Sequence, residues 1–457
     1  MKLVDRNTPP ASAALPVVRI PRFERQSLSN GLRVVLLEDP RFPSISLRLG
    51  LPGGNKVDPP SRTGIAETMA AMMTDGTPRH DARALAEQSA QIGAQFHFSA
   101  SDDFFMGVGT VLEDSFEPFL QLFTECLLDS TFPEEELVLR KQNRLHELMV
   151  ERSEAGYWAD ARMYELAFGA HPYAVTSPEP EHVAALERDD LVAMARNAFL
   201  PAETVLVLVG DLPERASLLA QLEGTLGQWK QQRSGEKPAA PRKPNGHDPA
   251  NTPIHLIHRA GSVQAELRMG RPAPSRLDAG YIPLTVLNTL LGGGASSRLF
   301  SEIREKQGLA YHVSSSFSSL VEGGILSLTT QVAMDRVGEA VRGLQHEIRR
   351  LVEEPIPAEE LASVRNYING TFVLRLESHG SLANQISGIQ LLGLGDDYLE
   401  TYTARVAAVT AGELQEIAAR YFVPEDYALV VAGDASVLEP QLKQFGTVQV
   451  SEPGSPT

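Results

Sequence analysis

The sequence is poor in the residues that disulfide-bonded, cysteine-metal or membrane-spanning proteins require. Its single cysteine, Cys126, excludes an internal disulfide and any zinc cluster built on cysteines, and we expect it in the core. No run approaches the roughly 18 apolar residues of a membrane span. Positive charge is also short, because 41 Lys and Arg stand against 58 Asp and Glu, a net charge of −17. Such a surface repels phosphate backbones and anionic lipid, so we expect no nucleic-acid partner and no membrane-surface role. The lack of a long apolar run predicts that there is no membrane span.

The length and composition are those of a globular protein with more than one domain. Apolar residues make up 42% and charged residues 22% of 457 residues, and at roughly 150 residues per domain about three domains are expected. The first 22 residues contain Asp5, Arg6 and several prolines, and they lack the apolar stretch of a signal peptide. As written, the protein is expected in the cytoplasm, and a periplasmic location is the alternative if a signal was trimmed.

The chain carries an internal duplication. Residues 190–212 (DLVAMARNAFLPAETVLVLVGDL) align without a gap to residues 413–435 (ELQEIAARYFVPEDYALVVAGDA). Each copy predicts a helix, an aromatic-proline break and a buried strand that ends in Gly-Asp. Two further pairs of segments recur in the same order, 45–54 with 265–274 and 133–137 with 357–361.

The duplication predicts two homologous halves of α+β fold. Within each half, neighbouring strands with short turns alternate with helices that cover the sheet. In the first half we expect strands at Leu32–Leu37, Ile45–Leu49, Ala94–Ala100 and Phe104–Thr110, and helices at about Thr63–Met73, Ala82–Gln91, Ser115–Leu128, Glu134–Glu151, Ala161–Phe168 and Arg188–Phe199. The predicted division is an extension 1–23, a first half 24–230, a Pro-rich linker 231–253, a second half 254–440 and a tail 441–457.

One string in the second half carries a resemblance to a known family. Residues 291–300 read LGGGASSRLF, followed by EIREK at 302–306 and GLAY at 308–311. With the doubled half, this string resembles the insulinase/pitrilysin/mitochondrial processing peptidase family of zinc metallopeptidases, over nearly the whole chain from about Glu24 to Leu438. The resemblance implies two α+β halves, each with a mixed or antiparallel sheet covered by helices, that form a clam-like chamber.

The zinc motif of that family is degenerate here. Family members that cut peptides carry H-x-x-E-H on a first-half helix, in which two histidines bind zinc and the glutamate takes a proton from the reactive water. The corresponding segment, 64–73, reads GIAETMAAMM, so Glu67 and Ala71 stand at the histidine positions and Ala70 at the base position. Glu147 stands where the family has its third ligand. Since methyl groups neither ligate a metal nor accept a proton, we expect no metal in this chain and no peptidase activity of the chain alone.

The resemblance also implies roles for Arg298 and Tyr311. In the family these two residues lie across a closed chamber from the metal, where the arginine holds substrate carbonyl oxygen and the tyrosine hydrogen-bonds the oxyanion. The sequence predicts a helix capped by Ser296 or Ser297 that runs to Lys306, and then a strand with Tyr311, Val313, Ser315 and Phe317 on one face. Arg298 and Tyr311 then come from adjacent elements. The alternative is that they are an ordinary helix residue and an ordinary sheet aromatic.

Two functions are open at this point. In the first, the chain is the metal-free subunit of a heterodimeric zinc metallopeptidase, in which a partner with H-x-x-E-H supplies zinc and this chain supplies Arg298, Tyr311 and part of the peptide-binding wall. Several bacterial family members resemble this arrangement, and a homodimer is the alternative assembly. In the second, the chain is a catalytically silent structural or peptide-binding subunit, similar to the core proteins of the respiratory bc1 complex.

Overall fold

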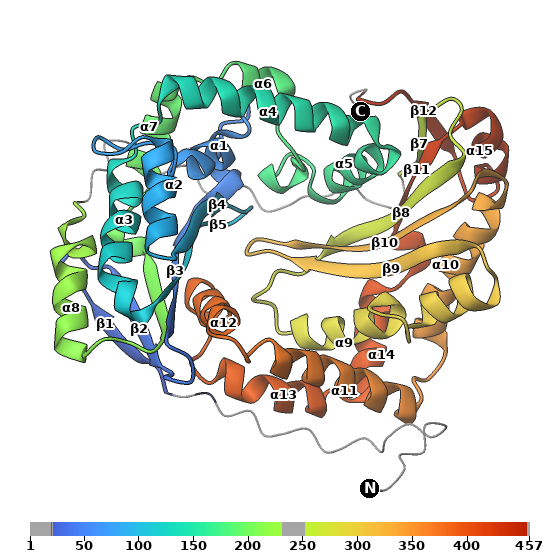
Figure 1. Ribbon diagram of the computed structural model, residues 1–457. Coiled ribbons are helices and arrows are strands. Elements are labelled where there is room, and N and C mark those ends of the chain that lie inside the picture. The colour runs from blue at the N-terminus through green and yellow to red at the C-terminus, as the bar shows by residue number, and fades with distance from the viewer. Residues whose placement is uncertain (1–19, 21, 231–251, 455–457) are drawn as a thin grey trace, which may run out of the picture.

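Two α+β halves face each other in a clam-like arrangement (Figure 1). The computed structural model describes residues 20, 22–230 and 252–454. The expected extension, 1–23, and the expected linker, 231–253, therefore fall almost wholly outside the described residues. The two homologous halves and the α+β class are confirmed, because each half contains one six-stranded mixed sheet with helices packed against it. None of the helices in the described ranges is both long and apolar enough to cross a membrane.

The first sheet has the strand order β1-β2-β6-β3-β5-β4. Only β2 and β6 run parallel, and the other neighbours are antiparallel. The strands are β1 (Glu24–Ser27), β2 (Arg33–Glu38), β3 (Ser44–Pro52), β4 (Gln95–Ala100), β5 (Phe104–Leu112) and β6 (Val205–Gly210). The four strands expected from the sequence are present as β2 to β5.

The second sheet repeats this order as β12-β7-β11-β8-β10-β9. Here β7 is parallel to both β11 and β12, whereas β11, β8, β10 and β9 are antiparallel neighbours. The strands are β7 (Ile254–His258), β8 (Gln264–Ala273), β9 (Ala310–Ser319), β10 (Gly324–Ala333), β11 (Ala428–Gly433) and β12 (Val448–Ser451). Because β12 pairs with β7, part of the segment expected as a tail, 441–457, is the edge strand of this sheet.

The helices also repeat from one half to the other. In the first half they are α1 (Ile65–Met72), α2 (Ala82–Gln91), α3 (Phe116–Asp129), α4 (Glu134–Ser153), α5 (Ala155–Phe168), α6 (Pro180–Ala184), α7 (Arg188–Ala198) and α8 (Arg215–Gly224). In the second half they are α9 (Tyr281–Gly292), α10 (Val337–Glu353), α11 (Ala358–Leu374), α12 (His379–Leu391), α13 (Tyr398–Ala408), α14 (Ala411–Tyr421) and α15 (Ala435–Leu442). Each of the six helices expected in the first half is present within a few residues, apart from an earlier start for α5.

One helix of each half packs against the sheet of the other half. Helix α5 of the first half packs on β8 and β11, and α12 of the second half packs on β3 and β6. Both faces of the central strands β6 and β11 are therefore covered, and every residue of these two strands is buried. This explains why both strands are continuous apolar runs, as is typical of strands buried on two faces.

Two arginines at equivalent places hold the exchanged helices. Arg48 in β3 donates through Nη2 to the carbonyl oxygen of Gly380 in α12 at 3.1 Å. Arg268 in β8 donates through Nε and Nη2 to both carboxylate oxygens of Asp160 in α5, at 2.6 and 3.1 Å. A Cβ would lie 3.3 Å from Arg48 Nη2 at Gly380 and 3.2 Å from Arg268 Nη2 at Gly156, so both glycines leave room for a guanidinium group.

The turn between β9 and β10 docks onto the first half. Its Glu322 accepts from Lys56 Nζ at 2.9 Å, and the backbone N–H of Val321 donates to Asp103 at 2.9 Å. Lys56 also contacts Asp103 at 2.9 Å, and the hydroxyl of Tyr173 donates to the same carboxylate. Figure 1 shows this turn reaching toward the ends of β4 and β5. A partly buried polar network thus joins the two halves at this turn.

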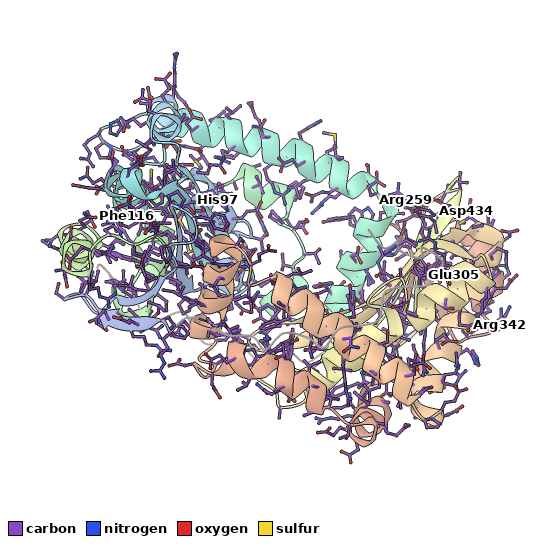
Figure 2. The ribbon with its side chains drawn as sticks, turned by 60° about the horizontal axis from the view of Figure 1, so that its bottom comes forward. His97, Phe116, Arg259, Glu305, Arg342 and Asp434 are labelled. Carbon is purple, nitrogen blue, oxygen red and sulfur yellow. The ribbon has the colours of Figure 1, made fainter. Side chains whose placement is uncertain are left out.

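The arm formed by α4 and α5 is fastened to the second half at its bend. Arg259, at the end of β7, donates to the carbonyl oxygen of Ser153, the last residue of α4, at 2.6 Å. Figure 2 shows Arg259 at the end of this long helix. Elsewhere in the first half, Cys126 is fully buried in α3, and burial raises the pKa of its thiol to about 12, so its expected place in the core is confirmed.

Candidate functional site

Helix α1 presents the segment that corresponds to the zinc motif. The helix begins after Gly64, whose φ of 94° favours glycine, and the carboxylate of Asp58 accepts from the backbone N–H groups of Gly64 and Ala66 at 2.6 and 3.0 Å. Glu67 and Ala71, one turn apart, lie on the half-buried face of α1, whereas Ala70 is buried against the core. The methyl groups of Ala70 and Ala71 offer neither a metal ligand nor a base.

A guanidinium group lies among the carboxylates of this region. Arg144, on α4, has its Nε 3.0 Å from the carboxylate of Glu67. Its Nη1 donates to Glu147 at 3.3 Å and to Glu151 at 2.8 Å. Glu67 and Glu147 therefore both contact the same positively charged group, the side chain of Arg144. Burial raises the pKa of Glu67, while the charge of Arg144 opposes the rise.

The residues present do not fit a zinc ion. Zinc in proteins is bound by imidazole, thiolate or carboxylate groups in near-tetrahedral geometry, with one open position in catalytic sites. Within the described ranges, no group of three His, Cys, Asp or Glu side chains is arranged to hold a metal. A guanidinium stays protonated and has no vacant coordination position, so Arg144 balances the carboxylates without supplying a Lewis acid.

A cavity of about 260 Å³ lies beside Glu67. It is lined by Asp58 and Thr63, which precede α1, and by the segment 169–178 that contains His171. Burial raises the pKa of Asp58 to about 6, against the lowering effect of its backbone hydrogen bonds. This carboxylate caps the helix that carries the degenerate motif, and its charge changes near neutral pH.

Arg298 is buried in an ion pair. Its side chain is 8% exposed, and its Nε and Nη2 donate to the two carboxylate oxygens of Glu360 on α11 at 2.8 and 2.7 Å. This is the bidentate geometry in which arginine binds carboxylates most strongly. The remaining nitrogen, Nη1, is buried and has no hydrogen-bond partner among the described residues. Arg298 also lines a cavity of about 260 Å³ together with Ser301, Glu302 and Arg350.

The segment around Arg298 differs in part from the predicted helix. The structure has a π-helix at Phe300–Lys306 in place of an α-helix from Ser296 or Ser297, and the hydroxyl of Ser297 accepts from the N–H of Phe300 at 3.4 Å. The glycine run before it allows close backbone approach, because a Cβ on Gly292 would lie 2.3 Å from the backbone nitrogen of Ser315 in β9. Isolated π-helical turns occur frequently at functional sites.

Tyr311 is one of the most exposed large side chains, with 84% of its surface open. The prediction that Tyr311 and Val313 lie on the same face of the strand is wrong. Strand β9 has a register shift opposite Thr330 and Val332, which leaves Tyr311 and His312 both exposed while Val313 is buried. The ring of Tyr311 lies 4.7 Å from the guanidinium carbon of Arg304, a cation–π contact.

The structure places Arg298 and Tyr311 in different surroundings. Among the contacts of the described residues, Arg298 is held by Glu360, and Tyr311 is held by Arg304. Sequence reasoning missed these partners and Arg144 as well. Only Glu360 left a signal, because it belongs to the string 357–361 that recurs in the duplication.

Comparison with known proteins places the chain in a family. Residues 33–175 match the family described as insulinase (peptidase family M16), and residues 185–368 match the peptidase M16 inactive domain. The chain belongs to the insulinase/pitrilysin family. The match to the inactive domain spans the end of the first half and much of the second half.

Relatives of similar length are found in several bacteria. The chain is 26% identical over 414 residues to the uncharacterized zinc protease YmxG of Bacillus subtilis, covering 90% of this chain and 98% of that protein. It is 24% identical over 403 residues to an uncharacterized zinc protease of Streptomyces coelicolor, covering 86% of each chain.

Solved structures share the fold along the whole length. A peptidase M16 inactive domain from Pseudomonas fluorescens has a TM-score of 0.82 and 24% identity, covering 90% of this chain and 98% of that one. The periplasmic protease PqqL of Escherichia coli has a TM-score of 0.77 and 18% identity. In that comparison 95% of this chain matches 49% of PqqL, so the chain corresponds to half of the longer protein.

Proposed function

We propose that this family member is the metal-free subunit of a two-chain zinc metallopeptidase. In this assembly a second family chain with an intact H-x-x-E-H motif holds zinc and carries the general base. The present chain binds peptide and offers Arg298 and Tyr311 to the scissile bond. Zinc would polarise the substrate carbonyl and activate water on the partner, and the phenol of Tyr311 would donate to the oxygen on which negative charge develops.

The observation that carries this proposal is the contrast between the two halves. In the first half, Ala70 stands at the position of the general base and Ala71 at the position of a zinc-binding histidine, and both have only a methyl group. The guanidinium of Arg144 balances the negative charge of Glu67 and Glu147. In the second half, the segment with Arg298 and Tyr311 is intact, and the hydroxyl of Tyr311 is open to a ligand. A chain that keeps only the substrate-binding groups needs a partner for catalysis.

The match to PqqL supports a two-chain assembly. This chain covers 49% of PqqL, a protein whose printed description is a periplasmic protease. A protease of that length contains room for a second unit of the same size. The proposal is that a separate partner chain takes the place of that second unit here.

The buried ion pair of Arg298 favours a second candidate, a structural or peptide-binding subunit without catalytic groups. Glu360 occupies two of the donor nitrogens that a substrate would need, and the third is buried. In this reading Arg298 fastens α11 to the π-helix. Substitutions at both positions distinguish the two candidates.

The test uses the complex of this chain with a candidate partner, a family chain from the same genome that carries H-x-x-E-H. We expect the co-purified complex to contain one zinc per pair and to cleave a quenched fluorescent peptide, and each chain alone to be inactive. Tyr311→Phe removes a single hydroxyl and should lower kcat by about 10²-fold, the scale of one lost oxyanion donor, with the complex intact. Arg298→Ala should raise KM as well.

A matched control is Arg271→Ala. Arg271 is also a shielded arginine of the second half in an ion pair, with Asp426 at 2.8 Å, and it is expected to leave kcat unchanged. Full activity of the Tyr311→Phe complex would favour the structural candidate. Zinc-dependent cleavage by this chain alone would contradict both.

A further inference from the structure

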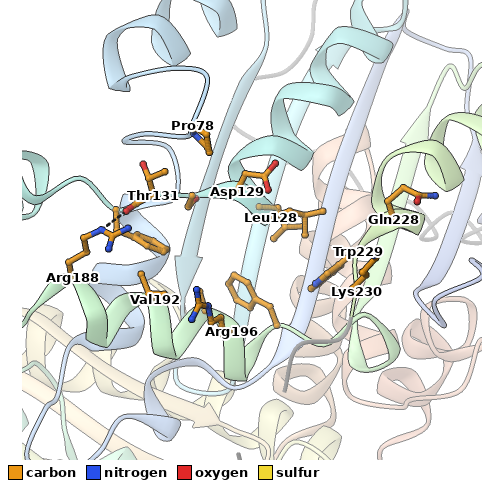
Figure 3. Close-up of a pocket in the computed structure, with 15 residues that line it drawn as sticks. Pro78, Leu128, Asp129, Thr131, Arg188, Val192, Arg196, Gln228, Trp229 and Lys230 are labelled. Carbon is orange, nitrogen blue, oxygen red and sulfur yellow. Dashed lines mark hydrogen bonds between the residues drawn. The ribbon is translucent and has the colours of Figure 1, made fainter. Parts of the chain in front are cut away.

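A pocket of about 450 Å³ lies in the first half between the end of α3, helix α7 and the segment that ends at Lys230. Its floor is apolar and includes Leu128, Val192, Phe199 and Trp229. Figure 3 shows Leu128, Val192 and Trp229 on the three segments around the pocket. Phe199 and Trp229 are buried residues whose edges reach the pocket, so an apolar ligand group can pack against them.

The rim of this pocket is cationic, although the chain carries a net charge of −17. Arg188, Arg196 and Lys230 line it, against one carboxylate, Asp129. The Nε of Arg188 donates to the carbonyl oxygen of Thr131 at 2.8 Å, and its Nη1 lies 3.8 Å from Asp189. Within the described residues, Arg196 and Lys230 have no ion-pair partner. The positive charge of the rim is therefore only partly balanced by the protein.

The internal duplication provides a comparison for the residues that line this pocket. Val192 of α7 corresponds to Gln415 of α14 in the aligned strings, and Gln415 donates through Nε2 to the carbonyl oxygen of Val352 in α10. In the second half this hydrogen bond joins α14 to the end of α10. In the first half the shorter, apolar Val192 lines the pocket, and Arg196 stands where the second half has Ala419.

We propose that this pocket binds an acidic peptide segment that inserts one or two large apolar side chains. The apolar floor accepts the side chains, and the rim attracts carboxylates that flank them. Figure 3 shows Arg188, Arg196 and Lys230 spread across the pocket rather than gathered at one end. Such spacing suits several acidic groups along an extended chain, whereas a fatty acid carries one charged head. Polar groups of Thr131 and Gln228 lie beside the floor for a peptide backbone.

The linker that follows Lys230 is a less suitable occupant. Residues 231–251 contain Arg233, Lys237, Arg242 and Lys243 against Glu236 and Asp248. This segment is therefore basic overall, and the cationic rim repels it. The proposal commits to a segment of another protein, and the linker is one of the outcomes that the experiment separates.

The experiment follows the fluorescence of Trp229 in the full chain. The protein has two tryptophans, so Trp158→Phe leaves Trp229 as the only indole. We expect the peptide acetyl-DELFED-amide to change its emission saturably, with an affinity that falls as salt rises. The basic peptide acetyl-KRLFKR-amide and the acidic peptide acetyl-DEGSED-amide, which lacks large apolar residues, should bind at least tenfold more weakly.

Two variants test the two features of the pocket. R196E/K230E reverses the charge of the rim, and V192Q places a longer, polar side chain on the floor, as at the aligned Gln415. Each change should weaken the binding of acetyl-DELFED-amide at least tenfold. R342E/K443E changes the net charge equally on the second half and should not weaken it. Equal binding of the basic peptide, no saturable change up to 1 mM, or saturation by decanoate alone would each overturn the proposal. The proposal would also be overturned if replacing residues 231–251 by a Gly/Ser repeat, with no peptide added, changed the Trp229 emission as much as the peptide does.

Discussion

The guanidinium of Arg144 lies 3.0 Å from the carboxylate of Glu67, where two helices of the first half meet. Glu67 stands at a position that a zinc-binding relative fills with histidine, and Glu147, on the same helix as Arg144, stands at the third ligand position. These positions are the ones that the family resemblance assigns. In the structure Arg144 contacts both carboxylates and balances their charge.

This relationship predicts that restoring the ligands alone is insufficient. Glu67→His with Ala71→His places two imidazoles one turn apart on α1, near Glu147. Arg144 then leaves a positive charge within a few ångströms of the metal position, which repels Zn²⁺. Adding Arg144→Ala should tighten zinc binding at least about tenfold, measured by calorimetry against a competing chelator.

The control for this prediction is Arg144→Ala by itself. It leaves Glu67, Glu147 and Glu151 without their shared cation, so we expect a lower stability and no tight zinc binding, since no imidazole is present. Equal zinc affinity of the variants with and without Arg144 would contradict the role assigned to it.

The sequence was informative where structure is local or repeated. The string 190–212 and its copy 413–435 predicted equivalent strands, and β6 and β11 hold the same place in their sheets. Strand and helix positions in the first half followed from apolar periodicity. The exchange of α5 and α12 was not predictable, because an apolar helix face does not reveal which of two similar sheets it covers.

The candidate site was predictable only in part, for a related reason. The residues of the degenerate motif could be assigned by position, but the pairing of Arg298 with Glu360 joins residues 62 positions apart through tertiary packing. The exposure of Tyr311 depends on a register shift in β9, which no residue type in that strand signals. Ion pairs and bulges of this kind are fixed by the fold rather than by local preference.

The pKa of Asp58, raised by burial to about 6, predicts a pH dependence of stability. A carboxyl group whose pKa is higher in the folded state contributes stability that is full below its unfolded pKa, about 4, and that is lost as pH rises through 6. Asp58→Asn keeps an acceptor for Gly64 and Ala66 but does not titrate. Relative to the variant, the natural protein should lose on the order of 2 kcal/mol between pH 4 and pH 7 in urea unfolding. A pH-independent difference would refute the assignment.

The ion pair of Arg298 with Glu360 predicts unequal costs in a double-mutant cycle. Glu360→Ala leaves a cation that is 8% exposed without its partner and should lower the free energy of unfolding by about 3 kcal/mol. Arg298→Ala should cost less, about 1–2 kcal/mol, because Glu360 is 29% exposed and water can reach it. The double variant should cost less than the sum by about 1 kcal/mol or more in urea unfolding, and additivity would show that the pair is not coupled.

The contacts of the equivalent arginines Arg48 and Arg268 predict different losses in the free energy of unfolding when each arginine is replaced. Arg268 is buried against the carboxylates of Asp160 and Glu266, so Arg268→Leu leaves both unpaired and should cost about 2–3 kcal/mol, after allowing for the half-exposed Asp160. Among the described residues, Arg48 donates only to backbone carbonyl oxygens, so Arg48→Leu should cost about 1 kcal/mol.

Hydrogen exchange locates these effects in the molecule. Arg268→Leu should speed amide exchange in α5 more than in α12, and Arg48→Leu should do the reverse, because each arginine contacts the helix lent by the other half. Arg83→Leu, at a position where the side chain is 87% exposed, is the matched control and should change the free energy of unfolding by no more than about 0.5 kcal/mol. If Arg268→Leu and Arg48→Leu both increased amide exchange in the same helix, the two arginines would not stabilise separate helices. Apolar packing alone would then have to hold the exchanged helices in place.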